Sequence, residues 1–239
     1  MEGTMGKTSF SGPLHYATSP GKPYLLGAPL TFNPDYFSVH HDFADGMATA
    51  TSFTVIKDTG AAVAVSPGQG LLITSAATTD DDGGSFQTIT LPFQPTANKR
   101  INFWARAKLS DATQSEMMIG LTEAFVTNPE AMLTAAEHIA FTKADGTTAV
   151  VAVNEADGTQ TASTTTTAKV MADDTFMDFG FVVNGTTSID YWINGTWVAN
   201  HTANINSDEA MALGFYHISG VATGTKTATV AYIGAAQER

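Results

Sequence analysis

The chain has 239 residues, no cysteine and a formal net charge of −12, with only 11 lysines and arginines. The lack of cysteine excludes disulfides and thiolate metal sites as supports of the fold, and the negative charge without a basic stripe makes nucleic acid an improbable partner. Its hydrophobic residues come in runs far shorter than the ~18 residues of a membrane span, and we expect no N-terminal export signal. Since no polar linker divides the chain, we expect a single domain preceded by an arm.

The arm is predicted over residues 1–41, where five of the nine prolines fall and no strand-like alternation is sustained. It is too apolar for a solvated tail, so it needs a surface, which either its own domain or another subunit could supply. We predict the second arrangement and therefore a homo-oligomer, with a trimer favoured over a dimer. The arm residues expected to bind a partner are Phe10, Leu14, Tyr16, Tyr24, Leu25, Leu26, Leu30 and Phe32.

The globular part is predicted over residues 42–239 and opens with short strands and turns. His40 and His41 precede it, and on a strand they point to opposite faces, so we do not expect them to share a metal ion. An acidic loop follows at residues 78–84. Its carboxylates could give oxygen ligands to calcium, but they lack the spacing of an EF-hand, and the alternative is a solvated loop. We expect no metal, and the candidates if one binds are Asp80, Asp81 and Asp82.

The longest alternating stretch, from Lys99 to Ser110, predicts a strand at the centre of a sheet. Trp104 points to its outer face, where it could stack on a sugar or pack against a loop or the arm. Beyond the next strand, Asn128, Pro129 and Glu130 have the order of a helix N-terminus and predict one short helix over residues 129–137.

The stretch from Thr175 to Ala203 predicts three antiparallel strands, because two apolar alternating runs are separated by Asn184-Gly185 and Asn194-Gly195. Two closing strands bring the expected total to about 13–14 strands. A single open sheet of that size would split into two packed layers. The fold class is therefore all-β, a two-sheet antiparallel jelly-roll sandwich with one short helix and an extended N-terminal arm.

Catalytic motifs are not found in the sequence. A glycoside hydrolase on such a sandwich would need two facing carboxylates, which on a strand means acidic residues at alternating positions. The eight glutamates are scattered instead, and no nucleophile elbow, metalloprotease motif or phosphate-binding loop is present. We therefore expect no enzyme, no catalytic residue and no cofactor.

Several segments of the chain resemble virion structural proteins of tailed bacteriophages that have a concanavalin A-like jelly-roll fold. The residues that carry the resemblance are Asp42-Phe43, Thr59 to Val65, Thr79 to Gly83, Phe103 to Glu116, Gly120-Leu121 and Asp190 to Gly195. In that family such proteins decorate or cement the capsid shell. The resemblance implies two sheets of six or seven strands and a structural role in the virion.

The function expected from these features is a non-enzymatic phage capsid decoration or cement protein. Its partners would be the major capsid protein and other copies of itself, without nucleic acid or membrane. The protein would be made in the host cytoplasm and located on the outer capsid surface. The alternative is a carbohydrate-binding module for host attachment, part of a phage fibre or tail, in which Trp104, Trp192 and Trp197 stack on sugars.

Overall fold

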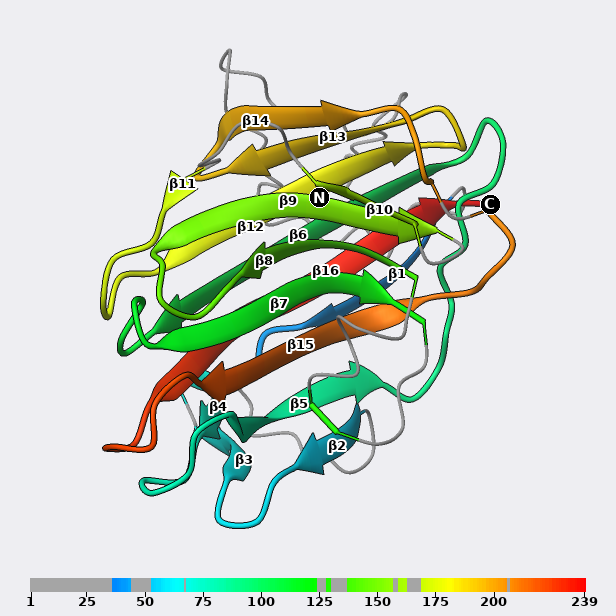
Figure 1. The fold of residues 1–239 in the computed structure, drawn as a ribbon. Helices are drawn as coiled ribbons and strands as arrows, with labels where there is room; N and C mark the ends of the chain where they lie inside the picture. The colour runs from blue at the N-terminus through cyan, green and yellow to red at the C-terminus, as the bar shows by residue number, and fades with distance from the viewer. Residues whose placement is uncertain are drawn as a thin grey trace, which may run out of the picture.

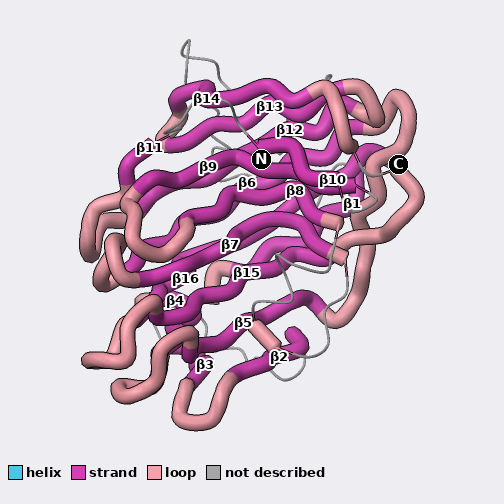
Figure 2. Tube along the Cα trace, viewed as in Figure 1, coloured by secondary structure: helices cyan, strands magenta, loops and turns pink. Residues whose placement is uncertain are grey.

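The computed structural model describes residues 36–43, 53–66, 68–123, 128–129, 137–156, 159–162, 169–205 and 207–239. Within these ranges the chain forms strands and loops without a helix (Figure 2). They form two eight-stranded antiparallel sheets (Figure 1). The predicted all-β, two-sheet antiparallel sandwich is confirmed. No helix in the described ranges is long and apolar enough to cross a lipid bilayer.

The strands in chain order are β1 (Tyr36–His41), β2 (Phe53–Lys57), β3 (Ala62–Ser66), β4 (Gly70–Thr74), β5 (Asp82–Thr88), β6 (Arg100–Leu109), β7 (Ser115–Thr122), β8 (His138–Lys143), β9 (Ala149–Ala156), β10 (Thr159–Ala162), β11 (Lys169–Val170), β12 (Met177–Asn184), β13 (Ser188–Ile193), β14 (Thr196–His201), β15 (Ala212–Ser219) and β16 (Thr227–Glu238).

Sheet A has the strand order β14-β13-β12-β6-β16-β4-β3, with β1 also paired to β16, and sheet B has the order β10-β9-β8-β7-β15-β5-β2, with β11 also paired to β9. Both sheets draw strands from the two halves of the chain. The predicted central strand is confirmed as β6, which lies between β12 and β16. The first half of the chain therefore cannot form a complete sheet without the second.

The main core lies between the sheets, because every second side chain of each strand points inward. Phe103 and Phe181 stack on neighbouring strands of sheet A with ring centroids 4.5 Å apart. Tyr191 of sheet A meets Phe141 of sheet B edge-on, and its hydroxyl donates a hydrogen bond of 2.9 Å to the carbonyl of Val153 in β9. Tyr191 thus joins the two layers through its ring and its hydroxyl.

A second apolar cluster lies on the opposite, outer face of sheet B. Neighbouring residues on β7 and β15 alternate between this cluster and the main core, as Met117 and Met118 do. Every buried member is at most 4% exposed, so this part of the face is covered. The buried residues of the cluster are Met118, Ala140, Val153, Tyr216 and Ile218.

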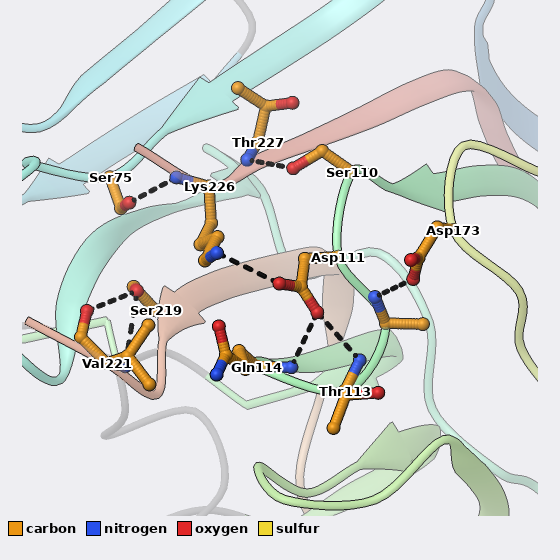
Figure 3. A network of polar contacts seen from close by, with 11 residues as sticks. Ser75, Ser110, Asp111, Thr113, Gln114, Asp173, Ser219, Val221, Lys226 and Thr227 are labelled. Atoms are coloured by element: carbon orange, nitrogen blue, oxygen red, sulfur yellow. Dashed lines mark hydrogen bonds and ion pairs between the residues drawn. The ribbon is translucent and has the colours of Figure 1, made fainter. Parts of the chain in front are cut away.

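One end of the sandwich is closed by a polar network between loops (Figure 3). Asp111, in the connection from β6 to β7, accepts hydrogen bonds from the backbone of Thr113 and Gln114 and pairs with the Lys226 ammonium at 2.9 Å. Lys226 in turn donates its backbone N–H to Ser75. Burial acts to raise the pKa of Asp111, but the hydrogen bonds from Lys226 and the backbone lower it overall. The network fixes the loop that carries the chain from sheet A to sheet B.

The predicted arm, helix and Asn-Gly turns differ in how far the structure describes them. Residues 36–41, assigned to the arm, form β1 and pair with the end of β16. The remaining arm residues, 1–35, lie outside the described ranges, as does most of the helix predicted over 129–137. Of the two Asn-Gly turns, Asn194-Gly195 is a two-residue turn with positive φ at both positions, whereas Asn184 ends β12 and a three-residue loop precedes β13.

The contrast between two glycines gives a stability prediction. A Cβ on Gly120 of β7 would lie 2.6 Å from the Cα of Ala140 on the neighbouring strand, whereas a Cβ on Gly180 of β12 would meet only the Phe103 carbonyl at 3.5 Å. We expect Gly120→Ala to lower the free energy of unfolding by about 1–3 kcal/mol through overpacking. Gly180→Ala should be neutral or stabilise by up to about 1 kcal/mol, because alanine restricts the unfolded chain. Urea unfolding of both variants measures this, and equal losses would contradict it.

Candidate functional site

The three tryptophans of the chain lie side by side on the outer face of sheet A. Trp104 of β6 pairs with Gly180 of β12, Gly180 pairs with Trp192 of β13, and Trp192 pairs with Trp197 of β14. Residues in direct register on antiparallel strands place their side chains on the same face. These four residues are called the tryptophan row below. The structure therefore brings together the three residues that the sequence named as candidates for stacking on sugars.

The row is accessible to solvent. Trp197 is 55% exposed, and Trp104, Trp192 and Gly180 are half-buried. A single exposed aromatic side chain is ordinary, but a row of neighbouring aromatic side chains that solvent can reach often marks a binding surface.

Trp104 is held in a fixed orientation. Its ring lies over Gly234 of β16, where a Cβ would come within 2.6 Å of the indole. Its Nε1–H donates a hydrogen bond of 3.1 Å to Nδ1 of His40, and the two rings stack with centroids 6.0 Å apart. Contact with a glycine on one side and a hydrogen bond at the edge keep the indole flat against the sheet. The sequence left open whether Trp104 stacks on a sugar or packs against a loop or the arm. It packs on Gly234 and against His40, which belongs to the arm predicted over residues 1–41.

His40 is the acceptor in this contact because it is uncharged near neutral pH. Burial lowers the pKa of His40 below its ordinary value of 6.5, and the nearby Asp42 only partly offsets this. His41 lies on the other face, where its ring is 4.5 Å from that of Phe53. The prediction that the two histidines point to opposite faces is therefore confirmed.

Polar side chains border the tryptophan row on one side. Asp190, opposite Asn200 in the next rung of the sheet, accepts hydrogen bonds from Asn200 at 2.9 Å, Asn184 at 3.0 Å and the Trp197 indole at 3.4 Å. This carboxylate therefore fixes both the amides and the outermost tryptophan.

The other border of the row holds an ion pair. Arg106 Nη1 lies 3.3 Å from Asp178 Oδ1, and both side chains are about 40% exposed. The Tyr232 hydroxyl donates to the same carboxylate at 3.0 Å. Burial, together with the charge and hydrogen bond of Asp178, raises the pKa of Tyr232 to about 12, so this hydroxyl keeps its proton. The row is thus a strip of aromatic side chains with hydrogen-bonding groups along both edges.

The outer face of sheet B offers a different kind of site. Glu116 of β7 accepts a hydrogen bond of 2.6 Å from the Tyr216 hydroxyl. Glu155 of β9 is a second carboxylate of this face, with Oε2 3.9 Å from Nδ1 of the buried His138. Glu155 pairs through His138 with Thr122, which lies six residues from Glu116 along β7. The Cα atoms of the two glutamates are therefore about 20 Å apart, well beyond the reach of their side chains. Glycosidase carboxylates lie roughly 5–9.5 Å apart, so Glu116 and Glu155 cannot act as such a pair.

The other candidates from the sequence do not form a site in the described ranges. Asp82 is buried and accepts a hydrogen bond from the Ala76 backbone, while Asp80 and Asp81 are exposed. Across the described residues, no group of three or more His, Asp or Glu side chains could hold a metal ion. The candidate arm residues Phe10, Leu14, Tyr16, Tyr24, Leu25, Leu26, Leu30 and Phe32 lie outside these ranges.

Two buried bases close to one another stabilise the fold rather than face an open site. Lys143 donates hydrogen bonds to the carbonyls of Ser115 and Ala144, and burial lowers the pKa of its ammonium to about 8. Burial also lowers the pKa of His217 to about 4, despite hydrogen bonds to the backbone of Glu116 and Lys226. Both belong to the inner, core-facing side of sheet B, where His217 pairs with Met117 and Met117 with Lys143.

No protein-family model matches the chain, and no curated protein is detectably similar to it. Solved structures do match. An endo-1,3-beta-glucanase from Streptomyces sioyaensis matches 86% of this chain and 98% of its own, with 15% identity and a TM-score of 0.61. A Bacillus licheniformis beta-glucanase matches 82% and 96%, with 9% identity and a TM-score of 0.60. A beta-1,3-1,4-glucanase from a mouse hindgut metagenome matches 82% and 97%, with 11% identity and a TM-score of 0.59. At these identities the likeness establishes the concanavalin A-like jelly-roll fold.

These comparisons correct two expectations from the sequence. We expected a non-enzymatic capsid decoration or cement protein, but the structures that share the fold are glucanases and other glycoside hydrolases. These fold neighbours are enzymes, so they overturn both the capsid function and the expectation that the chain is no enzyme. The predicted function was wrong because it was inferred from the absence of catalytic motifs. A fold can be retained between proteins that share very little sequence. The resemblance to virion proteins, the oligomer, the capsid partner and the location stay predictions.

The contact between His40 and Trp104 gives a prediction about pH. Because the pKa of His40 is lowered in the folded state, protonation occurs below pH 6.5, and stability falls as the pH falls through that range. Protonated Nδ1 cannot accept the indole N–H, so we expect Trp104 to loosen in acid. The fluorescence of a Trp192→Phe/Trp197→Phe protein, in which Trp104 is the remaining tryptophan, should change in one step below pH 6.5.

The matched control is His40→Gln in the same background. The glutamine amide oxygen can still accept the hydrogen bond but does not titrate, so the fluorescence step should disappear. A step that persists unchanged would show that another group causes it.

Proposed function

We propose that this protein binds carbohydrate through the tryptophan row on the outer face of sheet A. The observation that carries the proposal is the placement of all three tryptophans of the chain in one rung, on the solvent side of the sheet. Aromatic rings offer sugars a flat apolar face for their C–H groups, while the Asp190 and Arg106–Asp178 borders offer hydrogen bonds to hydroxyls. The glucanase-like fold supports the same class of ligand.

This proposal corresponds to the carbohydrate-binding alternative considered from the sequence. If the resemblance to tailed-phage virion proteins holds, the row would serve host attachment as part of a fibre or tail.

A second candidate function is glycoside hydrolysis on the outer face of sheet B. Two observations favour it, the glucanase-like fold and Glu116, a carboxylate on the central strand β7 that the Tyr216 hydroxyl holds in place. Release of reducing ends from soluble beta-glucans by the wild-type protein, lost in Glu116→Gln, would support it. Glucan hydrolysis that is unchanged in Glu116→Gln would contradict a role for Glu116.

Substitution of the tryptophans tests the binding proposal. We expect Trp197→Ala and Trp104→Ala each to weaken binding to a polysaccharide retained by the wild-type protein by at least about 1 kcal/mol, or roughly fivefold, because each removes a stacking ring. Affinity electrophoresis in gels that contain single polysaccharides gives the measurement. Both variants should stay folded, since Trp197 is exposed and Trp104 is half-buried.

The matched control for these variants is Ile89→Ala. Ile89 is a large apolar side chain with 60% exposure beyond the end of β5, in the other sheet. It should retain wild-type binding. Loss of affinity in Ile89→Ala equal to that in the tryptophan variants would contradict a site on sheet A, and a wild-type protein that binds no carbohydrate would overturn the proposal.

A further inference from the structure

The spacing of the tryptophan row limits which carbohydrate can use it. Neighbouring strands of a sheet lie about 4.8 Å apart, so the Cα atoms of Trp104 and Trp192, two strands apart, are about 10 Å from each other. A sugar ring in an extended β-linked chain is about as long as one strand spacing. The Cα atoms of Trp104 and Trp192 are therefore separated by about the length of a disaccharide. Because the Trp104 indole lies over Gly234 of β16, the Trp104 ring extends the row by about one more strand spacing at that end, and Trp197 extends it by one position at the other.

The position between the two indoles is bare backbone. Gly180 lies there, half-buried, and a Cβ added to it would meet nothing closer than the Phe103 carbonyl at 3.5 Å. A sugar ring can therefore pass over Gly180 without meeting a side chain of that residue. At the Trp104 end, Gly234 lets the indole lie down on the sheet, so the ring presents its face and not its edge. The row is a level strip that is longer than a short oligosaccharide, so a longer chain can lie along it.

The charges along the strip favour a neutral ligand. One border carries the Arg106–Asp178 ion pair, whose charges cancel, and the other carries Asp190 with two amides. The whole chain has a net charge of −12. A polyuronate or sulfated glycan would be repelled by this field, at short range by Asp190 and at longer range by the protein as a whole.

From this geometry we propose that the tryptophan row binds the interior of a neutral, β-1,4-linked polysaccharide chain, whose axis runs across the strands of sheet A. One ring stacks on the Trp104 indole over β16, the chain then crosses β6 and Gly180, and the following rings stack on Trp192 and Trp197. The inference rests on the proposed carbohydrate-binding function and adds the ligand class and its direction. An extended ribbon-like chain matches the level strip, whereas a helically coiled α-linked chain curves away from it.

Calorimetric titration with cello-oligosaccharides of increasing length tests the direction of the chain. With the Trp104 indole over β16, the row covers five strand positions, so we expect affinity to rise up to the pentasaccharide and then to level off. Malto-oligosaccharides of the same length should bind at least about tenfold more weakly, which corresponds to the loss of a single stacked ring or more. An oligomannuronate, which is β-1,4-linked but charged, should show no binding.

Gly180 supplies a variant aimed at this inference alone. Gly180→Leu places a bulky side chain in the middle of the strip while leaving all three tryptophans. It should weaken binding of the tetrasaccharide at least about fivefold and leave the disaccharide, which fits on Trp192 and Trp197, unchanged. Gly180→Ala is the matched control, since its single methyl group has open space and should alter affinity for the tetrasaccharide far less.

The outcomes separate the two proposals. If no cello-, malto- or charged oligosaccharide and no polysaccharide binds, the proposed function fails. If sugars bind and the tryptophan variants lose them, but affinity does not depend on length or linkage, the proposed function stands and the chain direction is wrong. Equal effects of Gly180→Leu on the disaccharide and the tetrasaccharide, or no effect on either, would likewise overturn a chain that crosses Gly180.

Discussion

The β-bulge in strand β16 determines what the outer face of sheet A presents. The register of β16 against β6 shifts between Val230 and Tyr232, so that one extra residue enters this strand. Without the shift, Val230, Tyr232 and Gly234 would point to the same side. With it, Val230 points to the core while Tyr232 and Gly234 face outward, next to Asp178 and under Trp104. Gly70 of β4 makes the bulge possible. Its φ of +114° is a conformation that favours glycine, and its lack of a Cβ leaves room for the Val230 carbonyl. A Cβ on Gly70 would also lie only 2.9 Å from the Cα of Ala231.

A second bulge does the same at the far edge of the sheet. Simple pairing from Tyr191 opposite Ala199 would set Trp192 opposite Val198, but the register shifts and Trp192 faces Trp197. Val198 then packs against the main core and Trp197 turns to solvent. The tight Asn194-Gly195 turn, with positive φ at both residues, leaves only Ile193 and Thr196 between the turn and this pair. The position of Gly234 under Trp104 and the outward position of Trp197 therefore each depend on a local departure from regular alternation, one in β16 and one between β13 and β14.

These departures explain which parts could be predicted from the sequence. The period of two along Lys99 to Ser110 and the Asn-Gly pairs were enough to place β6, β12, β13 and β14, and the number of strands was enough to require two layers. A closing strand was expected, but the bulge at Val230 could not be predicted, because it depends on Gly70, more than 150 residues away in the chain. The three tryptophans were named as sugar-stacking candidates one by one. That they share a rung follows from the pairing order β6-β12-β13-β14, which no single stretch of sequence contains.

The two outer faces of the sandwich differ in a way that decides where a ligand can bind. On sheet B, the outward residues of β7 and β15 include the fully buried Met118 and Tyr216, and Gly120 lies too close to β8 to accept even a methyl group. On sheet A, the corresponding rung holds exposed or half-buried indoles and a glycine with open space above it. Likeness to glucanases at 9–15% identity carries over the arrangement of strands but not the residues on either face. The argument for a carbohydrate ligand therefore depends on the local chemistry of sheet A: aromatic faces at strand spacing, bordered by partly exposed amides and an ion pair that balances its own charge.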